Sequence, residues 1–168
     1  MLKKFAIAIV MFVLPLGAMA QSKLAHMNSQ EIIVEMQEYK DAVATLESRQ
    51  KGYQDELTRI QEELQKKYNE YVAQADSLPR NIAERREKEI NDMNQRFQEF
   101  QQEASQAMQQ AQQDVMNPIL QKVSDAVQVV GKADGYTYVI DLANSSVTYV
   151  GTDAVDITAK IKAQLGIK

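Results

Sequence analysis

A stretch of 110 residues with almost no helix breakers constrains this fold more than any other feature of the sequence. Between Gln21 and Val130 the chain holds one glycine, Gly52, and two prolines, Pro79 and Pro118. The last forty residues, by contrast, contain four glycines. Because glycine and proline are the strongest local breakers of regular structure, this distribution predicts long helices followed by a turn-rich carboxyl-terminal part.

Apolar side chains in the first half of this stretch recur with coiled-coil spacing. Two interleaved sets with seven-residue spacing are Tyr39, Leu46, Tyr53 and Ile60, and Val43, Leu57, Leu64 and Tyr71, where Gln50 occupies the position between Val43 and Leu57. This pattern predicts a helix with one apolar stripe. Asn28 followed by Glu31 matches a capping box, so we expect the helix to begin near Gln30. If it continues to Leu78, its length is roughly 70 Å at 1.5 Å per residue.

The pattern breaks at Leu78 and Pro79, where proline disfavours helix in the residue before it and suits the first turn of a new helix. A return helix is expected from Arg80, because apolar residues resume the heptad spacing there. Its stripe consists of Ile90, Met93, Phe97, Phe100, Ala104, Ala107 and Ala111. Nine of the nineteen residues from Gln95 to Gln113 are glutamine, which we interpret as a solvated helical face. At Pro118 we expect a kink.

The carboxyl-terminal residues change character, since 136–142 and 147–150 are rich in β-branched and aromatic side chains. The turn-forming segment Asn144-Ser145-Ser146 separates them, so the pattern predicts an antiparallel hairpin. Residues 23–28 are a weaker third strand. A closing helix is predicted from Ile157, Ile161 and Leu165, with Asp156 as its cap and Gly166 as its end.

These pieces predict an α+β chain with two parts. Residues 37–116 form a long antiparallel helical hairpin, called here the arm. Residues 21–36 and 117–168 form a small β-rich unit, called the body. A unit of this size is near the limit for independent stability, so we expect it to be an oligomerisation unit.

The first twenty residues read as a secretory leader. Lys3 and Lys4 precede an apolar run from Phe5 to Leu16, and Ala18-Met19-Ala20 matches a cleavage site. We therefore expect cleavage after Ala20. The mature chain would then carry 17 Lys and Arg against 23 Asp and Glu, a net charge of −6. Because nucleic-acid affinity is built from clustered cations, a nucleic-acid partner is not expected.

The sequence offers little of the chemistry that enzymes use. His26 is the one histidine, there is no cysteine, and the carboxylates are scattered beside lysines and arginines. Catalysis requires nucleophiles, bases or metal ligands that converge on one place. We therefore expect a protein that is not an enzyme, with no catalytic residue, no metal site and no cofactor.

Several of these pieces together resemble the Skp/OmpH family. They are the leader, the strand from Lys23 to Ser29, the long hairpin, Asn117-Pro118-Ile119 at the base of the arm, and the ending from Gly135 to Asp141 and Asp156 to Thr158. The resemblance implies a jellyfish-like homotrimer in the periplasm, in which three arms surround a cavity. It also implies an ATP-independent holdase that binds unfolded outer-membrane β-barrel proteins before their membrane insertion.

Two sets of residues are candidates for these roles. Client-facing candidates are apolar or aromatic residues of the arm: Tyr68, Tyr71, Met93, Phe97, Phe100 and Met108. Candidates for assembly in the body are Leu24, Met27, Tyr138, Ile140, Val147 and Tyr149. For each arm residue the alternative is packing between the two helices.

One departure from the family concerns charge. The net charge of −6 argues against attraction to anionic membrane surfaces or lipopolysaccharide, which the family's basic members are linked to. A different function also fits the long rods, namely a structural coiled-coil adaptor or spacer of the cell envelope.

Overall fold

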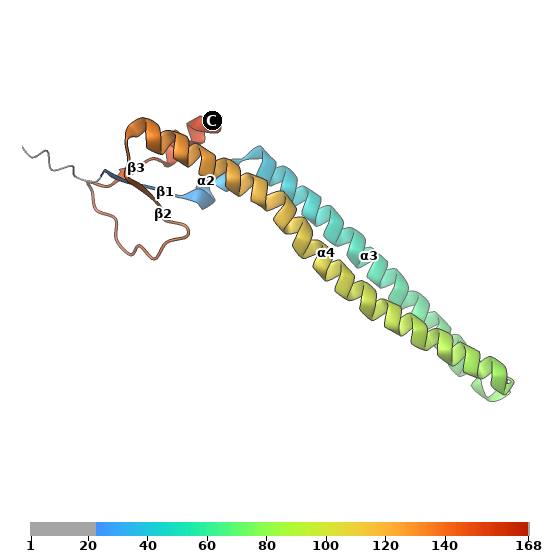
Figure 1. The fold of residues 1–168 in the computed structure, drawn as a ribbon. Helices are drawn as coiled ribbons and strands as arrows, with labels where there is room; N and C mark the ends of the chain where they lie inside the picture. Colours follow the sequence, from blue (N-terminus) through green and yellow to red (C-terminus); the bar gives the residue numbers. More distant parts are fainter. Residues whose placement is uncertain (1–22, 168) are drawn as a thin grey trace, which may run out of the picture.

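The structure is a computed structural model that describes residues 23–167, and the predicted leader, residues 1–20, lies outside this range. Two long helices project from a small end that holds all the strands (Figure 1). The elements in order are β1 (Leu24–Met27), α2 (Ser29–Glu35), α3 (Gln37–Gln74), the 3₁₀ turn η1 (Ala75–Ser77), α4 (Arg80–Asp134), β2 (Tyr138–Asp141), β3 (Val155–Asp156) and α5 (Thr158–Gln164). None of the helices within residues 23–167 has the length and apolar character needed to cross a membrane.

The predicted helical hairpin is confirmed, since α3 and α4 lie side by side along the arm (Figure 1). The tip falls where the sequence places it. Leu78 is extended, and Pro79 caps the start of α4 with φ −56°, a value that its ring favours. One 3₁₀ turn and these two residues reverse the chain.

The prediction of one unbroken helix from Gln30 to Leu78 is wrong. Met36 is extended, with ψ 136°, and it separates α2 from α3. Its side chain is only 2% exposed and belongs to the core of the body. Tertiary burial of Met36 therefore outweighs local helix propensity. No glycine or proline lies near Met36 to mark the break in the sequence. The start is as predicted, because the Asn28 side chain accepts a hydrogen bond from the amide of Glu31.

The helix α4 runs through Pro118 and continues into the body. Figure 1 shows α4 changing direction in this part of the chain, where yellow passes into orange. Proline removes one helical hydrogen bond and its ring crowds the preceding turn, which accounts for the predicted bend. Gly135 then ends α4 in a left-handed conformation with φ 68°.

The predicted antiparallel hairpin is also wrong. The sheet has the order β2-β1-β3, and both edge strands pair parallel to β1, with Leu24 opposite Tyr138 and Ala25 opposite Val155. Residues 147–150 are not a strand in the described chain. The strand β1, which the sequence predicts most weakly, is thus the central strand of the sheet. Both of its partners come from the other end of the sequence.

Helices cover one face of this sheet. Ala25 and Met27 point into a core built with α2, α5 and the last part of α4. Ile32, Ile157 and Ile161 are completely buried there. The closing helix begins at Thr158 with Ile157 as its N-cap in place of the predicted Asp156, whose carboxylate still accepts hydrogen bonds from the amide and the hydroxyl of Thr158. The body is therefore closed by both ends of the chain.

Candidate functional site

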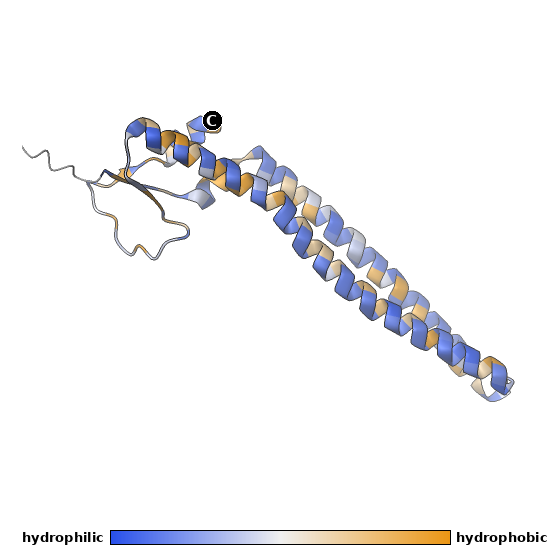
Figure 2. Ribbon diagram, viewed as in Figure 1, coloured by the Kyte–Doolittle hydropathy of each residue, from blue (hydrophilic) through white to orange (hydrophobic). Residues whose placement is uncertain are grey.

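The interface between the two arm helices is thin. Ala42 is the one buried residue of α3, and along the arm α4 buries only Met93, Ala104 and Ala111. Figure 2 shows both arm helices mostly in hydrophilic colours, interrupted by single hydrophobic residues. The remaining apolar residues of the predicted stripe are half-buried at the edges of the contact. An arm of this kind leaves part of its apolar surface in reach of a partner.

Three contacts join α3 to α4 along the arm. The rings of Tyr53 and Phe100 pack with their centroids 6.1 Å apart. Nearer the tip, Lys67 Nζ lies 2.5 Å from Glu89 Oε1. This hydrogen bond lowers the pKa of Glu89 and raises the pKa of Lys67. Tyr71 donates a hydrogen bond to Glu87, which raises the pKa of the Tyr71 phenol. The hairpin is therefore held by polar links as well as by apolar contacts.

The six client-facing candidates occupy different environments. Tyr68 is 51% exposed, whereas Met93 is 7% exposed and packs between the helices. Tyr71, Phe97, Phe100 and Met108 are half-buried. The structure therefore spreads them along the arm instead of gathering them into one pocket. Only Tyr68 presents most of its side chain to solvent, and Met93 is reachable only if the helices separate.

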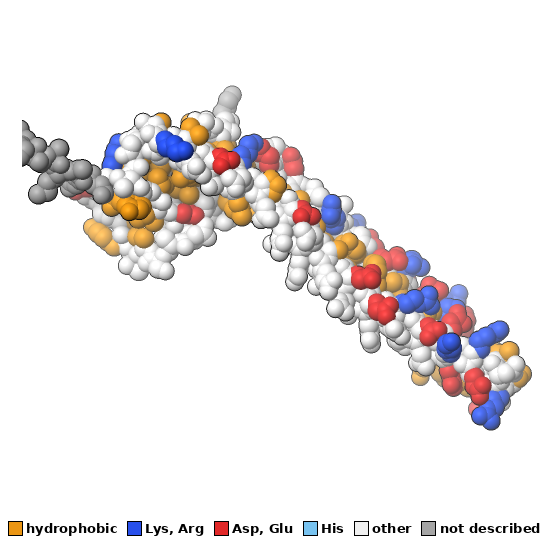
Figure 3. Space-filling model, viewed as in Figure 1, with side chains coloured by type: hydrophobic (Ala, Val, Ile, Leu, Met, Phe, Trp, Pro, Cys, Tyr) orange, Lys and Arg blue, Asp and Glu red, His pale blue; other side chains and the backbone are white. Residues whose placement is uncertain are grey.

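Three of the six assembly candidates lie on the uncovered face of the sheet. Leu24, Tyr138 and Ile140 share that face, because paired parallel residues project the same way and Ala25 projects into the core. Their side chains are 51%, 64% and 36% exposed. Met27 instead belongs to the core of its own chain. Figure 3 shows hydrophobic side chains gathered on this end of the molecule.

The segment between β2 and β3 adds further apolar groups beside this face. Val147, Tyr149 and Val150 are all exposed, with Tyr149 at 81%, and Val155 in β3 is exposed as well. Figure 1 shows the segment as an open loop that leaves the sheet and returns to it. The sequence identified Val147 and Tyr149 but missed Val150, which ends the same β-branched run, and Val155, which follows after Gly151 to Ala154.

A carboxylate holds this loop to the body. Asp141 accepts hydrogen bonds from the amide and hydroxyl of Ser29, at 3.0 and 2.5 Å, and from the side chain of Asn144 at 2.6 Å. Partial burial opposes ionisation of Asp141, but these hydrogen bonds outweigh it and hold the pKa of the carboxyl below its usual value. The end of β2 is thereby fixed to the start of α2.

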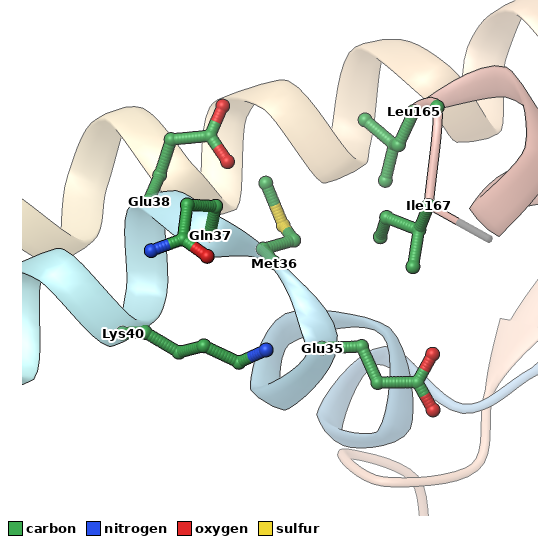
Figure 4. A pocket seen from close by; sticks show the side chains of 8 residues that line it. Glu35, Met36, Gln37, Glu38, Lys40, Leu165 and Ile167 are labelled. Atoms are coloured by element: carbon green, nitrogen blue, oxygen red, sulfur yellow. The ribbon is translucent and has the colours of Figure 1, made fainter.

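A hollow of about 520 Å³ lies where the arm joins the body. Figure 4 shows Met36, Leu165 and Ile167 at its apolar side, with the charged side chains of Glu35 and Lys40 near its opening. The sequence did not predict this hollow, because it depends on the break at Met36. Across residues 23–167 no three His, Cys, Asp or Glu side chains come together as a candidate metal site.

A long antiparallel hairpin on a small three-stranded body that closes with both chain ends defines a distinct class of fold. The chain belongs to the family of OmpH-like outer membrane proteins, whose model matches residues 23–165. This family is not known to be enzymatic.

Several proteins similar to this chain are described as chaperones. Chaperone protein Skp of Pectobacterium atrosepticum is 28% identical over 146 residues, which cover 87% of each chain. Chaperone protein Skp of Photorhabdus laumondii is 28% identical over 125 residues, covering 74% of this chain and 76% of that protein. A crystal structure of an OmpH-like protein from Caulobacter crescentus, described as an outer membrane chaperone, superposes with a TM-score of 0.74 at 17% identity, over 87% of this chain and 85% of that one. The family, these relatives and the shared fold support a chaperone of outer-membrane proteins in the periplasm.

Proposed function

We propose that this protein is an ATP-independent periplasmic holdase that binds unfolded outer-membrane proteins and keeps them from aggregating before membrane insertion. The arm is the observation that carries the proposal. It projects away from the body, its helices pack through a thin contact, and half-buried Phe97, Phe100 and Met108 remain at the edges of that contact. Many weak apolar contacts suit a client that must stay unfolded and leave without an energy source.

The mature protein is proposed to act as a homotrimer in which the bodies associate and the arms surround the client. The exposed apolar residues on the open sheet face support this, because a monomer would leave Leu24, Tyr138 and Ile140 in water. Both edge strands of the sheet are open within the described chain, and open edges favour pairing with another chain. Light scattering of the mature chain should give three times the chain mass, and a monomer at micromolar concentration would contradict the assembly.

The decisive experiment dilutes a urea-unfolded outer-membrane β-barrel protein into buffer with and without the mature chain, with no nucleotide added. Aggregation is followed by light scattering. Suppression near one oligomer per client is the expected result. Unchanged aggregation at several-fold excess would overturn the proposal.

The proposed division into a body and an arm has its own test. Removing residues 50–100 should leave an oligomeric body that no longer suppresses aggregation, because the core residues Ile32, Ile157 and Ile161 all lie outside the deletion. Loss of the folded body would show that the division is wrong.

A structural adaptor or spacer of the envelope remains the second candidate. The contacts that join α3 to α4, such as Tyr53 with Phe100 and Lys67 with Glu89, favour it because they would also stiffen a passive rod. The aggregation assay separates the two functions, since a spacer has no reason to bind an unfolded chain.

A further inference from the structure

The helix α4 carries a continuous face of neutral amides that the rest of the chain does not cover. Six of its glutamines project into one sector of about a third of the helix circumference, given 3.6 residues per turn. They are Gln98, Gln101, Gln102, Gln109, Gln112 and Gln113. We call this set the amide face. The buried residues Ala104 and Ala111 project toward α3, on the other side of the helix.

The six side chains are free to bind something else. All are exposed. Among the hydrogen bonds of residues 23–167, those of Gln95 and Gln110 go to acidic neighbours on the same helix, and none involves the amide face. Each glutamine offers two donors and one carbonyl acceptor, which are the groups that an unpaired peptide backbone needs.

The two borders of the amide face differ in chemistry. By the same helical spacing, Glu99, Glu103 and Asp114 lie beyond one border, with Glu99 nearest to the amide face. Phe97 and Met108, both half-buried, lie along the other. No charged residue occurs from 104 to 113. A ligand on this face would therefore meet neutral hydrogen-bonding groups in the middle, carboxylates on one side and apolar groups on the other.

Charge is distributed unevenly along the arm. In the half nearer the body, residues 37–58 and 97–116, three basic residues stand against eight acidic ones, a net charge of −5. In the outer half, residues 59–96, eight basic residues balance eight acidic ones. Figure 3 shows blue and red side chains mixed along the outer arm, where Lys67 and Glu89 pair. The net negative charge of the arm thus lies in the half that carries the amide face.

We propose that the amide face is a docking surface for an extended, unfolded polypeptide segment rich in Lys and Arg. The glutamines hydrogen-bond its backbone, Glu99, Glu103 and Asp114 attract its cations, and Phe97 and Met108 contact its apolar side chains. Charge complementarity selects this occupant, because a cationic segment meets attraction beside the amide face and no net field on the outer arm. The inference rests on the proposed holdase function and assigns it a preferred class of client segment.

The test uses the mature full-length protein and three labelled, unstructured peptides of equal length and apolar content, one cationic, one neutral and one anionic. Binding is measured by fluorescence anisotropy at low and high salt. The cationic peptide should bind tightest, and its advantage should disappear at high salt because screening removes it. A cationic peptide that binds no tighter than the anionic one would overturn the inference.

Matched variants locate the surface. Replacing Glu99, Glu103 and Asp114 by their amides should weaken binding of the cationic peptide by about fivefold and leave the neutral peptide unchanged. Replacing Glu62, Glu70 and Asp76 by their amides removes the same charge from the outer arm. This control variant should bind the cationic and the neutral peptide as the unmodified protein does. If both triple variants lose the same affinity for the cationic peptide, binding depends on the net charge of the protein and not on the amide face, and the inference is overturned.

The glutamines are tested by Gln102→Ala, Gln109→Ala and Gln113→Ala together, which keep the helix because alanine is the better helix former. Binding of all three peptides should weaken by about threefold, as expected for lost hydrogen bonds to solvent-exposed groups. Unchanged binding of the neutral peptide would remove the amide face from the proposal. If aggregation suppression persists while the peptide preference is absent, this inference fails alone; if no unfolded chain binds, the proposed function fails too.

Discussion

The body and the arm are stabilised in different ways. In the body, short elements from both ends of the chain bury Ile32, Ile157 and Ile161 completely. In the arm, α3 spans 38 residues and buries only Ala42. Apolar burial contributes in proportion to the area removed from water, so each residue of the body adds far more to stability than each residue of the arm. The body is therefore expected to be more stable than the arm, although it contains fewer residues.

The largest expected effect is in the body. Ile161→Ala should lower the free energy of unfolding by about 3 kcal/mol, because a fully buried isoleucine leaves a cavity in the core. Urea unfolding followed by circular dichroism measures this. Val129→Ala, at a 49% exposed site on α4, is the control and should cost little. Equal costs at the two sites would break the contrast between core and surface.

A smaller loss is expected at the best-buried site of the arm. Met93→Ala should cost about 2 kcal/mol, since Met93 packs between only two helices that can move together. Hydrogen exchange measures the effect locally, and amides of α3 and α4 should exchange faster while those of β1 remain protected. Faster exchange in β1 would mean that body and arm unfold as one unit.

Asp141 should contribute to the pH dependence of the body, together with Asp156, whose pKa is also lowered. The pKa of Asp141 is lower in the folded chain than in the unfolded chain, so its stabilising contribution is present above the unfolded pKa and is lost as the pH falls through the folded value. Asp141→Asn should cost about 1 kcal/mol at pH 7, where it weakens the bonds to Ser29 and Asn144, and should flatten the loss of stability below about pH 4. Thermal unfolding between pH 3 and 7 measures both. Asp153→Asn, at an exposed site, should leave the midpoint at pH 7 unchanged.

The smallest expected effect is a gain in the arm. Gly52 lies inside α3, and a Cβ placed there meets nothing within 4 Å, so Gly52→Ala should stabilise the helix by about 0.7 kcal/mol. Gly135→Ala is the opposite case, because φ 68° strains any residue with a Cβ. Thermal unfolding should show shifts of opposite sign for the two variants. Shifts of the same sign would mean that backbone conformation does not govern these sites.

The same difference between the parts explains what the sequence could predict. Heptad spacing is local information, so the positions of Tyr53, Phe100, Pro79 and Ala104 were enough to place the hairpin and its tip. The sheet is not local, because the partners of β1 lie more than a hundred residues away. Alternating β-branched residues at 136–142 indicate a strand but do not identify its partner. The nearest apolar run, Val147 to Val150, was therefore chosen wrongly.

The candidate sites follow the same rule. Leu24, Tyr138 and Tyr149 are predicted because aromatic and aliphatic residues in short β-prone segments stand out in the sequence, and the structure shows that all three are exposed. The sequence alone does not decide whether Met93 packs between the helices or faces a client, since both roles require the same residue types. The hollow beside Met36 could not be predicted, because Met36 interrupts a helix for a reason that lies in the distant residues of α5.

The central position of β1 also sets an order in time. The strand β1 receives its partners only when residues 138–141 and 155–156 are available, so the body cannot close until nearly the whole chain is present. The hairpin depends on neighbouring segments and can form earlier, and by folding back at Pro79 it brings the two ends together. The folded arm then holds the segments of the body close to one another. A chain truncated before Val155 would form the helical hairpin but would lack β3 and could not complete the body.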